Sequence, residues 1–342
     1  MNQPSVRYFV IKNSGKISLV HTLQDAQAGA GQDGYLWLDY CDPTTETLAE
    51  LIHNFGIHPL SIEDCINEEQ LPKLDIFPNY SFMIFNIFEP TLDELLTHEL
   101  DLLISDNFLI TVSHRDQTGT PLLQTTYNAI EREIVKVKLG PSFLMHLVVD
   151  MVVDHKFQAI VSIEEKLDRD EDNILNKAQN FNPVSLMNSR RDLQVIRRSL
   201  FHERELVAKL IRQDSPFIVE KSLVYYRDVY DHLSKYYEIS ESARDLVTSL
   251  MEIHLSMLSN QLAQSSNRTN KIMRRLTLIT TIFMPLTLIA SIGGMSEFTM
   301  MVGQENWKIA YLVLLLVMVV VAVINYILLL RMEKQLPKEE TN

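Results

Sequence analysis

A stripe of polar residues and methionines near the C-terminus is the part of this sequence whose residue types and spacing most clearly suggest a chemical role. Its members recur at alternating spacings of three and four residues: Asn270, Met273, Thr277, Thr280, Met284, Thr287 and Ser291. That spacing is a heptad seam along one side of a helix. Amide and hydroxyl side chains can hold hydrated ions, and methionine side chains can form a constriction that gates by dewetting. One helix cannot enclose a pore, so conduction needs several copies, and close packing through small hydroxyl residues explains the spacing equally well.

The stripe lies within the first of two uncharged apolar segments. Residues 309–330 match the roughly 20 apolar residues that span a bilayer, and residues 276–292 are shorter but continue a helix that can carry them across. Basic residues flank the pair: Arg268, Lys271, Arg274 and Arg275 before it, and Arg331, Lys334 and Lys338 after it. By the positive-inside rule, both termini are cytoplasmic and the 293–308 connector is external. We therefore expect a multi-pass protein of a bacterial-type inner membrane.

Upstream of the spans, the pattern changes from strands to helices at Gly140. Residues 1–140 predict a cytoplasmic α/β domain, with strands near Arg7–Ile11, Tyr35–Asp39, Ser81–Phe88, Leu100–Ile104 and Phe108–Ser113. Thr44 or Thr45 can cap a helix over Glu46–Phe55, and Pro59 and Pro72 bracket another. Residues 141–218 predict two long cytoplasmic helices, because Pro141 suits a helix start and prolines are sparse after it.

After Pro216 the sequence contains no proline until Pro285, which predicts one long helix. Residues 219–275 form a stalk helix that continues into the first span, 276–292, and together they reach about 110 Å. Pro285 predicts a kink in that span. The chain then has the 293–308 loop, the second span at 309–330 and a cytoplasmic tail at 331–342.

Composition excludes several classes of protein. The 342 residues include 31 Lys and Arg against 44 Asp and Glu, a net charge of −13, which argues against nucleic acid as a partner. The hydrophobic content of 46% excludes a disordered chain. Cys41 and Cys65 cannot form a disulfide framework and fit a reducing cytoplasm. The sequence that begins at Met1 shows no cleavable signal peptide.

No catalytic motif of the common kinds is present, so we expect no enzyme. His146, Asp150 and Asp154 share a helical face, for which we favour a solvated or ion-paired surface over metal ligation. An acidic cluster follows on the same predicted helix: Glu164, Glu165, Asp168, Asp170, Glu171 and Asp172. A solvated face is the favoured interpretation of that cluster, and a loose cation-attracting surface is the alternative.

Three segments carry a resemblance to a known family. Residues 58–73 read HPLSIEDCINEEQLPK, residues 226–232 read YRDVYDH, and residues 269–295 contain TN, MPLT and GM in order. On these segments the chain resembles the CorA metal-ion transporter family, of the 2-TM-GxN type. It departs from the first block at Leu71, where arginine is usual in the family.

The resemblance implies an α+β or α/β cytoplasmic domain, a long stalk helix and two C-terminal transmembrane helices, assembled as a funnel-shaped homopentamer. It places the polar stripe on the pore-lining face and the second span outside it. It implies magnesium, cobalt or another divalent cation as substrate and ligand, with no organic cofactor. The expected partners are other copies of the chain, the lipid bilayer and divalent cations. Regulatory metal binding is implied for Asp228, with a partner near Glu89–Glu94 of a neighbouring subunit, for which Glu89 is the candidate.

The outer pore mouth departs from the family pattern. The family signature is Tyr-Gly-Met-Asn, whereas this chain reads Gly293-Gly294-Met295-Ser296 and continues with Glu297. The selectivity loop is therefore predicted at Gly294, Met295, Ser296 and Glu297. Serine keeps a donor and acceptor but reaches less far than asparagine, and Gly293 replaces an aromatic residue that would stiffen the loop. In this loss the chain resembles the divergent CmaX-like branch.

Three functions compete on these observations. The first is a CorA-like channel or transporter for divalent cations, with selectivity altered by the missing asparagine. The second is a pentameric membrane scaffold or sensor that conducts little, which the same loss supports. The third is zinc transport, although the predicted pore mouth contains no histidine or cysteine to favour zinc.

Overall fold

The protein divides into two units, Met1–His254 and Leu255–Asn342. The structure, a computed structural model, describes residues 5–31, 33–67, 70–91, 95–124, 139–178, 180–295, 300, 303 and 307–335. Within these residues Cys41 and Cys65 are both buried, free cysteines.

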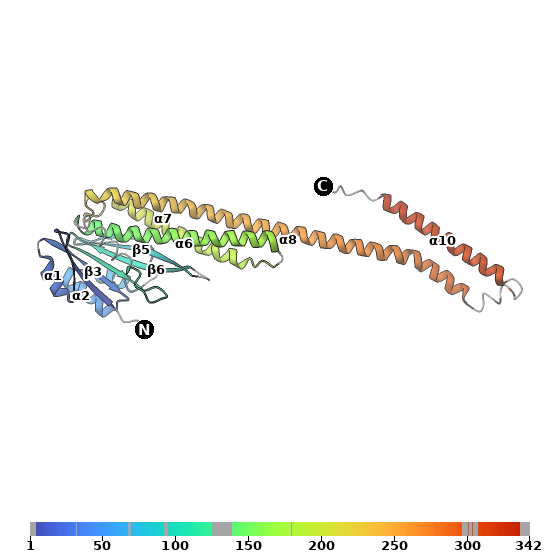
Figure 1. The fold of residues 1–342 in the computed structure, drawn as a ribbon, viewed down its shortest axis with the longest axis horizontal. Helices are drawn as coiled ribbons and strands as arrows, with labels where there is room; N and C mark the ends of the chain where they lie inside the picture. The colour runs from blue at the N-terminus through green and yellow to red at the C-terminus, as the bar shows by residue number, and fades with distance from the viewer. Residues whose placement is uncertain are drawn as a thin grey trace. The chain divides into compact units, whose positions relative to one another are not determined.

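A seven-stranded mixed sheet in the order β2-β1-β3-β7-β6-β5-β4 forms the centre of the first unit (Figure 1). Its strands are β1 (Ser5–Lys12), β2 (Ile17–Val20), β3 (Gly34–Cys41), β4 (Leu74–Ile76), β5 (Ser81–Pro90), β6 (Leu95–Ile104) and β7 (Phe108–Ser113). Neighbours are antiparallel except for the parallel pair β3 and β7. All five predicted strands are present, while β2 and β4 were missed because runs of four and three residues are too short to show a strand pattern.

Three short helices cover one face of this sheet: α1 (Leu23–Ala30), α2 (Thr45–Phe55) and α3 (Pro59–Asp64). Alternate residues of β3, including Leu36, Leu38 and Tyr40, join the core beneath these helices, as the two-residue period of a strand requires. Thr44 caps α2 by accepting a hydrogen bond from the Thr47 amide. His58 caps α3, because its Nδ1 accepts from the Leu60 amide at 3.1 Å. The HPL segment of the sequence therefore builds a helix start.

Two long helices, α6 (Pro141–Lys177) and α7 (Val184–Ile211), cover the opposite face (Figure 1). Helix α6 crosses β3, β5, β6 and β7, and α7 contacts β5. A short 3-10 turn, η1 (Glu220–Ser222), leads into α8 (Leu223–Gly293). The buried Tyr226 hydroxyl donates to the Ser142 carbonyl at 2.7 Å and so joins the start of α8 to the start of α6.

A fully buried ion pair connects α6, α7 and β5. Lys156 Nζ lies 3.0 Å from Glu203 Oε1, and neither side chain has any solvent exposure. The lysine also donates to the Asn86 carbonyl and lies 4.8 Å from the centre of the Phe88 ring. Burial lowers the pKa of Lys156, and the charge of Glu203 opposes that effect. Sequence patterning did not predict this pair, because nothing local marks a lysine as buried.

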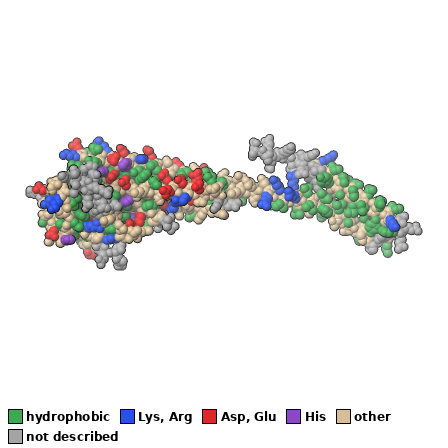
Figure 2. Space-filling view, in the orientation of Figure 1, with side chains coloured by type: hydrophobic (Ala, Val, Ile, Leu, Met, Phe, Trp, Pro, Cys, Tyr) green, Lys and Arg blue, Asp and Glu red, His purple; other side chains and the backbone are tan. Residues whose placement is uncertain are grey.

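The second unit contains the C-terminal part of α8 and helix α10 (Trp307–Gln335). Both α8 and α10 contain a segment long and apolar enough to cross a membrane, and their apolar side chains dominate the surface of this unit in Figure 2. Helix α8 ends one residue beyond the predicted first span, and α10 begins two residues before the predicted second span.

Candidate functional site

The polar stripe of α8 lies on a face that α10 leaves uncovered. All seven stripe residues are exposed, and Met284 keeps 76% of its surface accessible. The half-buried residues of the same segment are Leu278, Ile282, Pro285, Leu286 and Ile289. At 100° per residue, these two sets occupy opposite sides of the helix. The segment therefore has one apolar face turned toward α10 and one polar face free for other copies of the chain or for water.

The threonine hydroxyl groups of the stripe point their hydrogens back into α8. Thr277 donates to the Met273 carbonyl at 3.0 Å, Thr280 to the Leu276 carbonyl at 3.0 Å, and Thr287 to the Phe283 carbonyl at 2.8 Å. A hydroxyl group that has donated its hydrogen presents only acceptor lone pairs outward. Such a surface favours cations and the water around them over anions.

The predicted selectivity loop begins directly at the end of α8. Gly294 donates its amide to the Ala290 carbonyl at 2.9 Å, and Met295 donates to Ile292 at 3.2 Å, so both residues continue the last turn. Ser296 and Glu297 lie outside the residues that the structure describes. Gly293 is a buried, helical residue, which corrects its interpretation as a source of loop flexibility.

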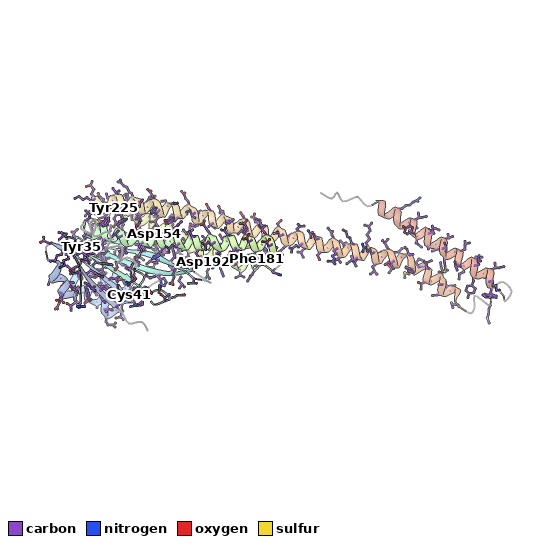
Figure 3. All side chains as sticks on the ribbon, viewed as in Figure 1. Tyr35, Cys41, Asp154, Phe181, Asp192 and Tyr225 are labelled. Carbon is purple, nitrogen blue, oxygen red and sulfur yellow. The ribbon has the colours of Figure 1, made fainter. Side chains whose placement is uncertain are left out.

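A second candidate site joins α6 to α8 in the first unit. Asp150, Asp228 and His232 each place one ligand atom within 4.8 Å of the others. Asp228 and His232 are one turn apart on α8, and Asp150 approaches from α6. Figure 3 labels one residue on each of these two helices, Asp154 on α6 and Tyr225 on α8.

The electrostatics of this group suit a cation. The pKa of Asp150 is raised, mainly by burial and then by the nearby charges of Asp154 and Asp228, while His232 opposes the shift. The Nδ1 atom of His232 is buried and has no hydrogen-bond partner among the described residues. Two carboxylates and an imidazole form a mixed oxygen and nitrogen donor set. Magnesium prefers oxygen ligands, whereas cobalt and similar metals also accept imidazole.

The structure corrects the interpretation of His146, Asp150 and Asp154 as one solvated face. His146 is buried, with its ring 5.1 Å from the Tyr225 ring and 5.5 Å from the Phe143 ring, so it packs among aromatic groups. Asp150 is half-buried in the α6–α8 group, and only Asp154 is exposed. The spacing within α6 identified Asp150, but its partners on α8 required the tertiary fold.

Glu89, predicted as a metal ligand with Asp228, lies on β5. Its Oε2 is 3.0 Å from Nε2 of His98 in the same chain, and Glu89 does not belong to the Asp150 group. Its role as a ligand between subunits stays a prediction.

The acidic cluster of α6 is mostly a polar surface, as favoured from the sequence. Glu165, Asp168 and Asp172 are exposed, and Figure 2 shows acidic side chains gathered on the visible face of the first unit. Asp170 is the exception, because it is buried and accepts a hydrogen bond from the Ser185 hydroxyl at 2.7 Å. This residue anchors α7 to α6 and is not part of a solvated face.

Comparison with known proteins decides the family. A family model described as "CorA-like Mg2+ transporter protein" matches residues 32–331. The cobalt/magnesium transport protein CorA of Thermotoga maritima is 33% identical over 284 residues, covering 82% of this chain and 77% of that protein. This chain belongs to the CorA-like family. Members of that family are ion transporters and not enzymes, which confirms the expectation drawn from the missing catalytic motifs.

Solved structures agree with the CorA fold. The complete CorA magnesium transporter from Methanocaldococcus jannaschii superposes with a TM-score of 0.67 at 21% identity, covering 94% of this chain and 96% of that one. The full-length CmaX protein matches with a TM-score of 0.66 at 18% identity, covering 96% of this chain and 97% of that one. The predicted fold of an N-terminal domain with a sheet, a long helix and a C-terminal apolar helix is thereby confirmed. Placement in the CmaX-like branch stays a prediction, because likeness at this identity shows the fold alone.

Proposed function

We propose that the protein is a homopentameric channel or transporter for divalent cations, Mg²⁺ and Co²⁺ among them, with weakened discrimination between them. The observation that carries the proposal is the polar stripe of α8 on the face opposite α10. In a five-fold assembly that face can meet the axis while α10 lies outside. The relative from Thermotoga maritima, named as a cobalt/magnesium transport protein, supports the same substrates.

The orientation in the membrane follows from charge. Arg268, Lys271, Arg274 and Arg275 precede the apolar part of α8, so that end lies at the cytoplasmic side of an inner membrane. The first unit is then cytoplasmic, and the loop after Gly293 is external. Divalent cations enter past Ser296 and Glu297, where a carboxylate from each subunit attracts cations without choosing among them.

Weak selectivity follows from the chemistry of Ser296. Discrimination between hydrated ions needs acceptors held at a fixed distance from the water shell, and the short serine side chain reaches less far than asparagine. The zinc alternative gains no support from the described part of the loop, because Gly294 and Met295 offer zinc no side-chain ligand that it commonly takes.

Uptake into proteoliposomes tests the proposal. We expect purified protein to carry Mg²⁺, Co²⁺ and Ni²⁺ at rates within about tenfold of one another, a spread of roughly 1.4 kcal/mol in barrier height, and to exclude K⁺. Ser296→Asn should widen the preference for Mg²⁺. Mass measurement in nanodiscs should show five chains of 39.5 kDa each. An intact pentamer without flux of any ion would favour the scaffold or sensor function, and a stable monomer would remove the pore.

We further propose that the group formed by Asp150, Asp228 and His232 binds a regulatory divalent cation that holds the closed state. Asp228 is exposed, so it can also face a neighbouring subunit, while Asp150 and His232 are half-buried beside it. Without a cation, the two carboxylates repel each other across the α6–α8 contact.

Replacing Asp150 by asparagine is expected to weaken Co²⁺ binding by about 10- to 100-fold, the range typical when a group that supports a metal site is lost. The visible absorption of bound Co²⁺ in the purified protein measures this directly and does not depend on transport. His232→Ala should remove the nitrogen contribution to the spectrum. Asp231→Asn, an exposed neighbour outside the group, is the matched control. Equal Co²⁺ affinity in all three variants would contradict the site.

A further inference from the structure

The last residue of α8 is tied to α10 by one hydrogen bond. The Tyr311 hydroxyl donates to the Gly293 carbonyl at 3.2 Å. Carbonyl groups in the last turn of a helix have no partner within that helix and need one from elsewhere. Tyr311 supplies that partner at the peptide unit that leads directly into Gly294 and Met295.

The packing of the two helices leaves little room beside Gly293. A Cβ atom at this position would lie 2.4 Å from Leu314 Cδ2, well inside normal contact distance. An added Cβ would therefore displace the Leu314 side chain, which lies one turn from Tyr311 on α10. Gly293 therefore permits the close approach of the two helices on which the hydrogen bond depends.

The ring of Tyr311 is itself held in place on α10. The Trp307 ring, one turn earlier, meets it edge to face at 6.3 Å and 80°. Lys308 Nζ lies 5.7 Å from the centre of the Trp307 ring. An edge-to-face pair of this kind restricts both side chains. The hydroxyl group of Tyr311 is thus presented to Gly293 from a restrained position.

We propose that Tyr311 is a positioning residue for ion selection, which orders the start of the selectivity loop through the Gly293 carbonyl. The inference rests on the proposed function of that loop. The hydrogen bond fixes the peptide plane between Gly293 and Gly294, and so restrains the direction in which Gly294 and Met295 follow the helix. Leu314 and Gly293 set the spacing at which the bond forms.

Spin labelling at the loop tests the ordering without any need for transport. The single label is attached through Met295→Cys, because Cys41 and Cys65 are buried at 1% and 2% exposure. In the full-length protein in nanodiscs, Tyr311→Phe should raise the mobility of the label. Tyr326→Phe is the matched control, since Tyr326 lies on the same helix, is 57% exposed and has no hydroxyl bond among the described residues. Unchanged mobility in Tyr311→Phe would overturn the proposal.

Transport assays measure how loss of the Tyr311 hydrogen bond changes the selection between ions. In Tyr311→Phe the ratio of Mg²⁺ to Co²⁺ uptake should change by about fivefold, the equivalent of one neutral hydrogen bond, with the oligomer intact. Gly293→Ala should have a similar effect, and Gly293→Ala with Leu314→Ala should restore the ratio by making room for the added carbon. Raised mobility with an unchanged ratio would overturn the role in selection. If the wild type carries neither ion, the proposed function fails, while raised mobility would still support Tyr311 as the residue that orders the loop.

Discussion

Lys156→Met is expected to lower the free energy of unfolding by about 3–5 kcal/mol, the cost of leaving a buried charge without its partner. Glu203 has no solvent exposure, so water cannot take the place of the lysine. Among the described residues, the partners left to the carboxylate would be the Asn86 backbone amide at 2.8 Å and the Ser199 hydroxyl at 3.0 Å. Urea titration of the purified protein, followed by circular dichroism, measures the loss.

The double variant Lys156→Met with Glu203→Gln is the control for this effect. Glutamine keeps an acceptor oxygen for the Asn86 amide and the Ser199 hydroxyl but carries no charge. We therefore expect the double variant to recover most of the lost stability, since buried pairs replaced together cost little. A double variant as unstable as Lys156→Met would show that lost packing, and not the unpaired charge, dominates.

Met284→Ser is expected to raise ion flux in the closed condition by at least about tenfold, which corresponds to removing roughly 1.4 kcal/mol from the barrier. Met284 is 76% exposed, more than Met273 at 56%, and lies on the face opposite α10. Several methionine side chains converging on an axis would expel water, and a hydrated ion enters a dry constriction at high cost. Serine would let water remain there. Uptake into proteoliposomes at high internal Mg²⁺ provides the measurement.

Ile279→Ser is the matched control for the gate. Ile279 is also an exposed apolar residue of α8, but it lies outside the heptad seam. Its replacement should leave flux in the closed condition near that of the wild type. Equal increases in both variants would mean that the polar stripe does not mark the conducting face.

Much of the fold was readable from local patterns. The runs at Ser81–Phe88 and Phe108–Ser113 predicted β5 and β7, because buried strands need continuous apolar side chains. A threonine cap at position 44 or 45 predicted the start of α2, and Thr44 is the residue whose hydroxyl group satisfies an amide of the first turn. The edge strands β2 and β4 escaped prediction, because their three or four residues carry little patterning of their own.

The candidate sites were likewise predictable where they depend on spacing within one helix, and not where they depend on contacts between helices. The seven residues of the polar stripe were predicted correctly as one helical face, because a helix converts spacing in the sequence into position around its axis. The group of Asp150 with Asp228 and His232 was not predicted. Asp150 lies more than seventy residues before the other two in the sequence and meets them only where α6 packs on α8. The local signals were the one-turn spacing of Asp228 and His232 on one helix and the helical face of α6 that holds Asp150.

The sequence by itself determined the two apolar spans, the long helix and the heptad seam, because each depends on residue types at regular spacing along one element. Only the tertiary structure decided that α10 covers the face of α8 opposite that seam. It also decided that Gly293 is a packed helical residue and not a flexible one. It also decided that Lys156 is buried beside Glu203. These outcomes depend on which side chains from distant elements meet, and no local spacing encodes the partner across a helix–helix or helix–sheet contact.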